Sequence, residues 1–226
     1  MVPDGSNSRF IFPRSANYLL PVLVLVAVGG GIYLTVLVAF GASPKTTAVG
    51  YQPEQPLPYS HAVHVGRLGI DCRYCHNTVE STPFASIPPT QICMNCHASI
   101  RADAPTLLPV RQSWANGTPI PWIKVHDLPD YAYFNHSAHV NKGVACVSCH
   151  GRVDQMDVVR QTQPLSMAWC LDCHRNPENF LRPNDQVTNM LWTPPAGDQH
   201  KIGLQLKKLY QIRDPNYLTS CSTCHR

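Results

Sequence analysis

Charged side chains are scarce in this sequence of 226 residues. Asp, Glu, Lys and Arg make up only 14% of it, and no run of Lys or Arg stands behind the formal net charge of +4. A nucleic-acid-binding surface needs clustered basic residues, so nucleic acid is not expected as a partner. The sequence also has no nucleophile elbow, no HExxH motif and no phosphate-binding glycine loop. Composition and motifs therefore give no sign of a hydrolytic or nucleotide-binding site.

Cysteine and histidine are unusually frequent, with Cys 10 and His 11, and the 21 prolines predict a loop-rich fold with few long regular elements. Ten cysteines have four possible uses: disulfides, zinc ligands, redox dithiols or haem attachments. The spacing between them decides among these uses.

One long apolar segment lies near the N-terminus. No charged residue occurs from Ser15 to Pro44. As a helix, its centre from Tyr18 to Gly41 is long enough to cross a bilayer core of about 30 Å. A cleaved signal peptide is the alternative, but signal h-regions run only about 7–15 residues. We therefore expect residues 17–42 to form a transmembrane anchor helix.

The charges that flank this segment predict its orientation. Arg9 and Arg14 precede it, whereas only Lys45 follows it closely. Positive charge favours the cytoplasmic side, so residues 1–16 are expected to be a cytoplasmic tail. Residues 43–226 would then form a domain outside the cytoplasmic membrane.

All ten cysteines fall into five copies of one motif, CxxCH. The copies are Cys72–Cys75–His76, Cys93–Cys96–His97, Cys146–Cys149–His150, Cys170–Cys173–His174 and Cys221–Cys224–His225. Two thiols at this spacing can add to the two vinyl groups of one porphyrin, and the adjoining His can then bind the iron as proximal ligand. Zinc ribbons and redox dithiols also contain CxxC, but they do not need a His after every pair. The motifs predict five covalently attached haem c groups.

Six histidines lie outside these motifs: His61, His64, His126, His136, His139 and His200. Four of them form two HxxH pairs, and residues three apart share one helix face, so each pair could reach two neighbouring haems. We expect His61, His64, His136 and His139 to be distal iron ligands.

The HxxH pairs also reveal an internal duplication. In each copy an aromatic residue precedes the pair, and two CxxCH motifs follow it. The expected organisation is a two-haem unit at about 59–97, a second at about 134–174, and a fifth haem at 221–225.

One distal position then remains without a paired histidine. Met167 lies three residues before Cys170 and could supply a thioether ligand, which would raise the reduction potential relative to a second His. Its alternative role is packing against a porphyrin face. His126 and His200 are its rivals for this position.

The expected fold class is a multihaem cytochrome c, in which short α-helices and loops pack around five covalent haems. One N-terminal transmembrane helix is expected in addition. Proline-rich loops are predicted at 52–58 and 103–121. The haem-free stretch 175–220 is expected either to pack along a partner or over the haems, or to be an ordinary surface excursion. Irons with two protein ligands each leave no open position for a substrate. The pattern therefore favours electron transfer, with no catalytic site in this chain.

Several longer motifs closely resemble a known family. They are SHxxHxGxLGIDCxYCH at 60–76, PDYxYFNHSAHVxxGVxCxxCHGRVDQM at 129–156, LSMxWCLDCHRNP at 165–177, and a terminal CxxCHR. Together with the N-terminal anchor they resemble the pentahaem cytochrome c subunit of alternative complex III, a membrane quinol oxidoreductase of respiratory or photosynthetic chains.

The resemblance implies partners: an integral membrane subunit that oxidises quinol, an iron–sulfur subunit and a monohaem cytochrome c. By resemblance to simpler multihaem cytochromes, His61 would serve the haem on Cys72 and Cys75, and His136 the haem on Cys146 and Cys149. His64 and His139 would serve other haems, within or between the haem pairs.

Two other functions stay open. The chain could be a self-sufficient, membrane-anchored quinol dehydrogenase that feeds a periplasmic reductase, or a periplasmic electron store. The anchor has no acidic or His residue near its outer end, which argues against quinol binding by this chain alone.

Overall fold

The computed structural model describes residues 13–41 and 48–225, so most of the expected cytoplasmic tail lies outside the described residues. The chain divides into two units, Met1–Thr46 and Thr47–Arg226. The first contains a short 3-10 helix, η1 (Arg14–Tyr18), followed by α1 (Leu19–Gly41). Ser15–Gly41 is helical and apolar enough to cross a membrane, and a signal sequence would pass the same test.

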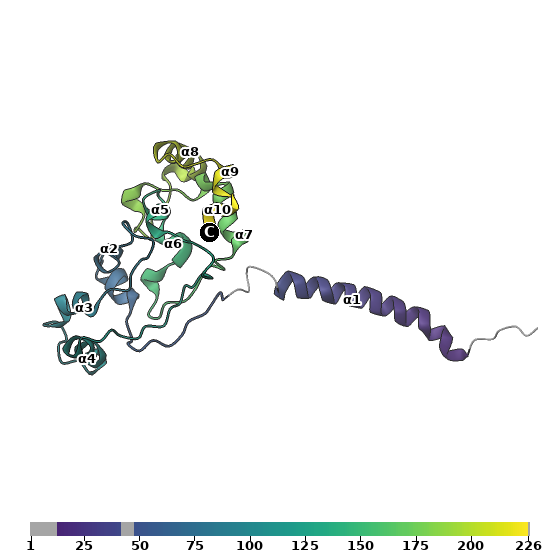
Figure 1. Ribbon diagram of the computed structural model, residues 1–226, viewed down its shortest axis with the longest axis horizontal. Helices are drawn as coiled ribbons and strands as arrows, with labels where there is room; N and C mark the ends of the chain where they lie inside the picture. The colour runs from purple at the N-terminus through teal and green to yellow at the C-terminus, as the bar shows by residue number, and fades with distance from the viewer. Residues whose placement is uncertain (1–12, 42–47, 226) are drawn as a thin grey trace, which may run out of the picture. The chain divides into compact units, whose positions relative to one another are not determined.

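The second unit consists of short helices and loops (Figure 1). Its α-helices are α2 (Cys72–Cys75), α3 (Thr90–His97), α4 (Leu108–Asn116), α5 (His136–Val140), α6 (Cys146–His150), α7 (Met167–Arg175), α8 (Gln199–Leu209), α9 (Pro215–Leu218) and α10 (Cys221–Cys224). Other helical turns are η3 (Ala62–Arg67), η4 (Pro105–Leu107), η5 (Val153–Gln155), η6 (Pro177–Asn179), η7 (Asn184–Gln186) and η8 (Pro195–Gly197). Over residues 48–225 no strand forms, and Val144 and Leu181 make an isolated antiparallel bridge. The predicted helix-and-loop architecture is confirmed.

Every CxxCH motif lies on one of these short helices: α2, α3, α6, α7 or α10. Side-chain caps start two of them, because Asp71 accepts a hydrogen bond from the backbone N–H of Arg73, and Ser166 from that of Trp169. A helical turn brings the two cysteines of a motif to neighbouring positions and places the histidine just beyond them.

The predicted loop at 103–121 is wrong in its centre, where the chain forms η4 and α4. Pro109 occupies the first turn of α4, where its missing N–H has no partner to lose, and Gly117 ends the helix with a left-handed φ of 66°. Val110 of α4 is buried against Leu57 and Ile120. The loop predicted at 52–58 is free of helix and strand.

The stretch 175–220 is not a loop, because it contains α8, α9 and three 3-10 turns. The helix α8 packs on η6. Lys207 forms an ion pair with Glu178 at 2.8 Å, and Gln199 donates a hydrogen bond to the Leu181 carbonyl at 2.7 Å. Gly203 fits against the Glu178 carbonyl, where an added Cβ would meet the oxygen at 1.7 Å.

Replacing Gly203 by Ala is therefore expected to displace α8 and to destabilise the protein by about 2–3 kcal/mol, more than the gain in helix propensity. Denaturant unfolding of the haem-loaded protein measures the change. Gln205→Ala on the exposed face of α8 is the control and should stay within about 0.5 kcal/mol. An unchanged Gly203→Ala variant would contradict the close packing of α8 on η6.

The two copies of the duplication interlock. The first HxxH turn, which includes η3, packs against η5 just after the third CxxCH motif, and the Ala62 N–H donates to the Met156 carbonyl at 3.0 Å. The second HxxH helix, α5, packs against the segment just after the first motif. There the His136 N–H donates to the Pro83 carbonyl at 3.0 Å, and the Asn141 amide donates to the Glu80 carbonyl at 2.8 Å. The first His61–His64 turn is π-helical rather than α-helical.

The apolar core of this unit is small. One buried cluster is Leu57, Val110 and Ile120, and another is Val79, Val140 and Val187. A domain of this length ordinarily buries a large apolar area. One motif cysteine packs against each cluster, Cys93 against the first and Cys146 against the second, so the small core adjoins the motif helices.

Candidate functional site

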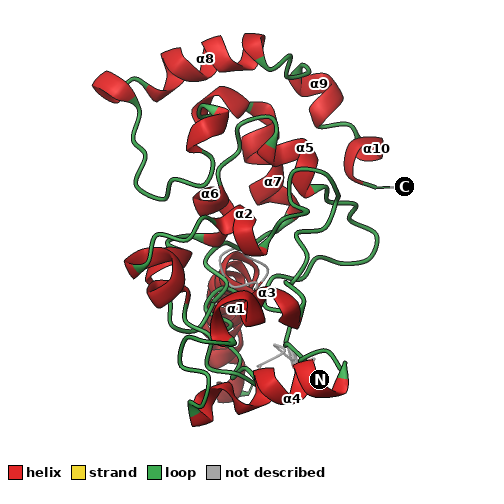
Figure 2. Ribbon diagram, turned by 90° about the vertical axis from the view of Figure 1, so that its left-hand side faces the viewer, coloured by secondary structure: helices red, strands yellow, loops and turns green. Residues whose placement is uncertain are grey.

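The five motif helices form a row. Figure 2 shows them in the order α3, α2, α6, α7, α10 across the second unit. Electrostatic interactions between thiols link each motif to the next: Cys93 with Cys75, Cys72 with Cys146, Cys149 with Cys173, and Cys170 with Cys224. The spatial order of the motifs is therefore second, first, third, fourth and fifth in sequence.

Most of these thiols are held in their neutral form. Burial raises the pKa of Cys149 to about 12 and that of Cys173 to about 11, with neighbouring thiols adding to the effect. Cys72 is an exception, because a hydrogen bond with Cys146 lowers its pKa.

Seven histidines share one arrangement, in which ring Nδ1 lies on a backbone carbonyl and Nε2 is left free. They are His64, His76, His97, His136, His139, His174 and His225, with Nδ1–oxygen distances of 2.7–3.0 Å. A carbonyl at Nδ1 fixes the tautomer and orients the ring of a metal-bound histidine. Four of the seven are predicted proximal ligands and three are predicted distal ligands.

Two pairs of rings have the separation that one metal ion would impose. The centroids of His64 and His97 are 6.1 Å apart, and those of His139 and His174 are also 6.1 Å apart. A metal–imidazole nitrogen bond is about 2 Å long, so imidazoles on opposite sides of one ion have centroids about 6 Å apart. Each pair joins the second His of an HxxH motif with the His of the second CxxCH motif in the same unit.

The aromatic residue before each HxxH pair holds both rings in place. Tyr59 stacks on His64 at 4.5 Å and meets His61 edge-on at 4.8 Å. Phe134 stacks on His139 at 4.5 Å and meets His136 edge-on at 4.7 Å. The two units that are similar in sequence therefore also have the same arrangement of aromatic and histidine rings. Sequence reasoning noted these aromatic residues but not their contacts.

Two further histidines, His61 and His126, lie near the first and third motifs together with His136. Burial lowers the pKa of His61 to about 4, with the charges of His76 and His64 adding to the effect, and burial also lowers the pKa of His136. Neutral imidazole is the form that binds metal. The His126 ring lies 4.4 Å from that of His150, which is too short for opposite sides of one iron.

The fifth motif has a different environment. His225 Nδ1 lies 2.9 Å from the Tyr131 carbonyl oxygen, to which it can donate, and the Tyr133 N–H donates to the Cys224 carbonyl. Met167, the predicted distal ligand, begins α7 and is 63% exposed. His200 lies on α8 with Nδ1 3.1 Å from the side-chain oxygen of Asn179.

Asp71 stabilises the first motif helix through its charge. The Arg73 guanidinium, bound at 2.9 Å, lowers the pKa of Asp71 to about 2, and Thr188 adds a hydrogen bond at 3.0 Å. A carboxyl whose pKa is lower in the folded state stabilises the fold above about pH 4, and this contribution is lost as the pH falls towards 2.

Asp71→Asn should accordingly lower the free energy of unfolding at pH 7 by about 1 kcal/mol, a value reduced by the partial exposure of the ion pair. Unfolding curves at pH 7 and pH 3 check this, because the difference between wild type and variant should shrink at the lower pH. If the free energies of unfolding of wild type and variant differ by the same amount at both pH values, the lost stability comes from the helix cap alone and not from the charge of Asp71.

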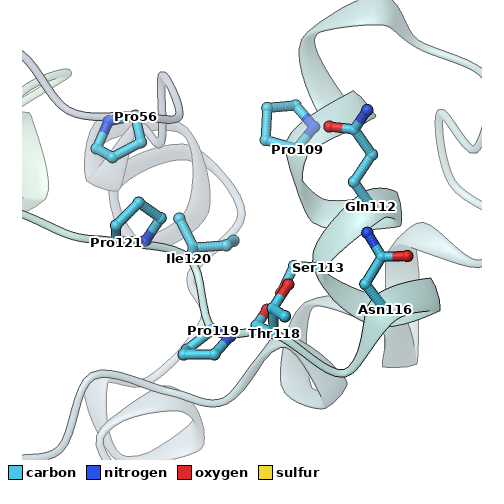
Figure 3. A pocket seen from close by; sticks show the side chains of 9 residues that line it. All are labelled: Pro56, Pro109, Gln112, Ser113, Asn116, Thr118, Pro119, Ile120 and Pro121. Carbon is cyan, nitrogen blue, oxygen red and sulfur yellow. The ribbon is translucent and has the colours of Figure 1, made fainter.

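Two surface hollows of about 390 and 580 Å³ flank α4. Figure 3 shows the smaller one, with Gln112 and Asn116 on one side and Pro121 on the other. No cysteine or histidine lines either hollow. At their floor Ser113 already donates a hydrogen bond to the Thr118 carbonyl at 2.6 Å. The chemistry-bearing residues therefore lie elsewhere, along the row of motifs.

The residues present fit c-type haem. Free Nε2 atoms, neutral imidazoles, two cysteines on each motif helix and ring pairs at 6.1 Å all match its requirements. In contrast, across residues 13–41 and 48–225 no three His, Cys, Asp or Glu side chains converge as a site for a lone metal ion would require.

Five CxxCH motifs on short helices are the arrangement that covalent attachment of haem c requires. The comparisons agree: residues 132–226 match the family described as cytochrome c7 and related cytochrome c. The chain is also 33% identical over 118 residues to the menaquinone reductase multiheme cytochrome c subunit of Nitratidesulfovibrio vulgaris. That match covers 52% of this chain and 55% of the relative, so the chain spans about half the length of the curated protein it matches.

Proposed function

We propose that this chain is a membrane-anchored electron-transfer subunit carrying five covalently attached haem c groups. The observation that carries this proposal is the row of five CxxCH helices, in which each motif adjoins the next. When bound, haem iron supplies a one-electron Fe(III)/Fe(II) couple. The chain's part is to fix the spacing, the axial ligands and the local charge along the row.

Each iron is assigned two ligands from this chain. The 6.1 Å ring separations support His64 opposite His97 and His139 opposite His174. For the first and third motifs we assign His61 with His76 and His136 with His150, following the resemblance to simpler multihaem cytochromes. His61, His76, His126, His136 and His150 interact electrostatically as one group, so these interactions place the histidines together but do not choose among the pairs. For the fifth, Met167 is assigned opposite His225, because Cys170, one turn after Met167, interacts with Cys224.

His126 and His200 are not assigned as iron ligands, because each has another contact. His126 touches His150 on the ring itself, and His200 is held by Asn179 on the exposed α8. The buried Nε2 of His126 has no hydrogen-bond partner, but the His126 ring lies against His150 of the third motif, so we assign it no role at the fifth. Met167 supplies a softer ligand, so the fifth haem would have a higher potential than a haem bound by two histidines.

We further propose that α1 is a retained anchor, with residues 1–16 in the cytoplasm and 43–226 on the periplasmic side. The length and hydropathy of Ser15–Gly41 and the arginines before it support this orientation.

The complex we propose is alternative complex III, with this chain as its pentahaem subunit. Its partners would be an integral membrane subunit that oxidises quinol, an iron–sulfur subunit and a monohaem cytochrome c. The motif resemblance supports this assignment, and the relative named for menaquinone reductase supports a complex that works with a quinone. That name describes quinone reduction, whereas we propose quinol oxidation. A row of one-electron centres can carry electrons in either direction, so the partner proteins would determine the direction of electron flow.

Purification from membranes in mild detergent tests the proposal. We expect the chain to co-purify with the three partners, and quinol to reduce its haems only in the intact complex. If the isolated chain is reduced by quinol without other subunits, it is a self-sufficient quinol dehydrogenase instead. If the complex reduces quinone but is not reduced by quinol, the proposed direction is wrong.

A further inference from the structure

Arg182 is a buried cation without a carboxylate partner. Its side chain is only 9% exposed, and none of the ion pairs within residues 48–225 includes it. One guanidinium nitrogen, Nη1, donates to the Asn189 carbonyl at 2.9 Å and more weakly to the Gln186 carbonyl at 3.4 Å. Its Nε is buried and has no hydrogen-bond partner. Buried charges are ordinarily paired, so this one is unusual.

The surroundings hold the guanidinium in place without neutralising it. The ring of Trp192 lies 5.0 Å from its central carbon, which is a cation–π contact. The Arg182 N–H donates to the Gly143 carbonyl at 2.9 Å, beside the bridge between Val144 and Leu181. Burial lowers the pKa of Arg182, but arginine titrates so far above neutrality that the side chain stays charged.

This charge lies next to the third CxxCH motif. The Arg182 guanidinium binds the Gln186 carbonyl, and the next carbonyl along the chain, that of Val187, accepts a hydrogen bond from the Cys146 N–H at 3.2 Å. The Val187 side chain also packs against Cys146. The motif helix α6 begins at Cys146 and follows α2 in the row.

We propose that Arg182 sets the reduction potential of the haem on Cys146 and Cys149, raising it above the value it would have without this charge. Reduction of a haem adds an electron, and a fixed positive charge in a low-dielectric interior stabilises the reduced form. The inference rests on the proposed haem attachment at this motif. Its consequence is a central haem that retains electrons better than its ligands alone would dictate.

Spectroelectrochemical titration of the purified holoprotein tests this with three variants. Arg182→Gln should lower one of the five midpoint potentials and leave the other four in place. Arg182→Lys should retain the wild-type value at pH 7, because it keeps the charge. Arg160→Gln removes an exposed arginine that water screens, and it should change none of the five.

The lysine variant decides the matter even if the glutamine variant does not assemble. A buried lysine loses its proton at a lower pH than arginine, so the same midpoint potential should fall in alkaline solution in Arg182→Lys and not in wild type. The Tyr210 ring lies beside Gly143 in wild type and in Arg182→Lys alike. Any effect of Tyr210 on the midpoint potential is therefore the same in both proteins and does not contribute to the difference between them. Unchanged potentials in Arg182→Gln, an equal fall of all five, or no alkaline difference in Arg182→Lys would overturn the proposal. A haem count below five by intact mass would instead point to failure of the proposed attachment.

Discussion

Replacing both Cys146 and Cys149 by serine is expected to leave almost no stable protein in the membrane. These cysteines would attach the central haem of the row, and Cys146 also packs against the buried cluster of Val79, Val140 and Val187. Without the porphyrin the site would become a large apolar cavity, and cavities of even a few methyl groups cost several kcal/mol. Because whole-protein stability is only about 5–15 kcal/mol, such a loss exceeds what the fold can absorb.

Immunoblotting of membranes with a C-terminal tag measures the effect. Ser148→Ala, within the same motif, is the matched control and should accumulate like wild type. Wild-type amounts of the double serine variant, folded and with four haems, would show that the polypeptide alone builds the core. That outcome would contradict the view that porphyrins supply much of the apolar interior.

Replacing His64 by Ala is expected to convert one of the five haems from low spin to high spin. The His64 ring is the one placed 6.1 Å from His97, and its Nδ1 lies 2.8 Å from the Ser60 carbonyl, so Nε2 is free for the iron. Removing it leaves one iron with a single strong-field ligand. The duplication predicts the same change for His139→Ala, in a different haem.

Electron paramagnetic resonance and electronic absorption spectra of the oxidised variants report the spin states. His200→Ala is the control, because Asn179 already binds His200, and it should leave all five haems low spin. A high-spin signal in His200→Ala, or none in His64→Ala, would overturn the ligand assignment. A double variant that lacks both His64 and His139 should show two high-spin haems.

The local parts of the site could be predicted from the sequence. The CxxCH spacing predicts the attachment cysteines and proximal histidines, because the chemistry we propose for them is contained within five consecutive residues. The repeated HxxH pattern predicts two equivalent units, and the matched stacking of Tyr59 on His64 and Phe134 on His139 agrees with it.

The long-range parts could not be predicted in this way. The interlocking of each HxxH turn with the other unit depends on tertiary contacts such as Ala62 with Met156. Helix α4 was missed because 103–121 is rich in proline and polar residues, although Pro109 and Gly117 sit at its two ends, where such residues favour a helix. The role proposed for Arg182 could not be predicted from the sequence, because it depends on the burial of this side chain near a cysteine that is distant in sequence.

Five bound haems would also change the net charge of the protein. Two propionates on each of five haems would outweigh the formal +4 of the polypeptide, so that value says little about docking. Local charges such as Arg182, buried among neutral groups, have more effect on the haems than the sum does.

Intact-mass spectrometry of the protein purified from membranes, combined with a haem assay, tests the central claim most directly. The account predicts the polypeptide plus five covalently bound haems, with no cysteine left to alkylate. A bare polypeptide mass, a bound zinc ion in place of haem, or free thiols at any of the five motifs would contradict it.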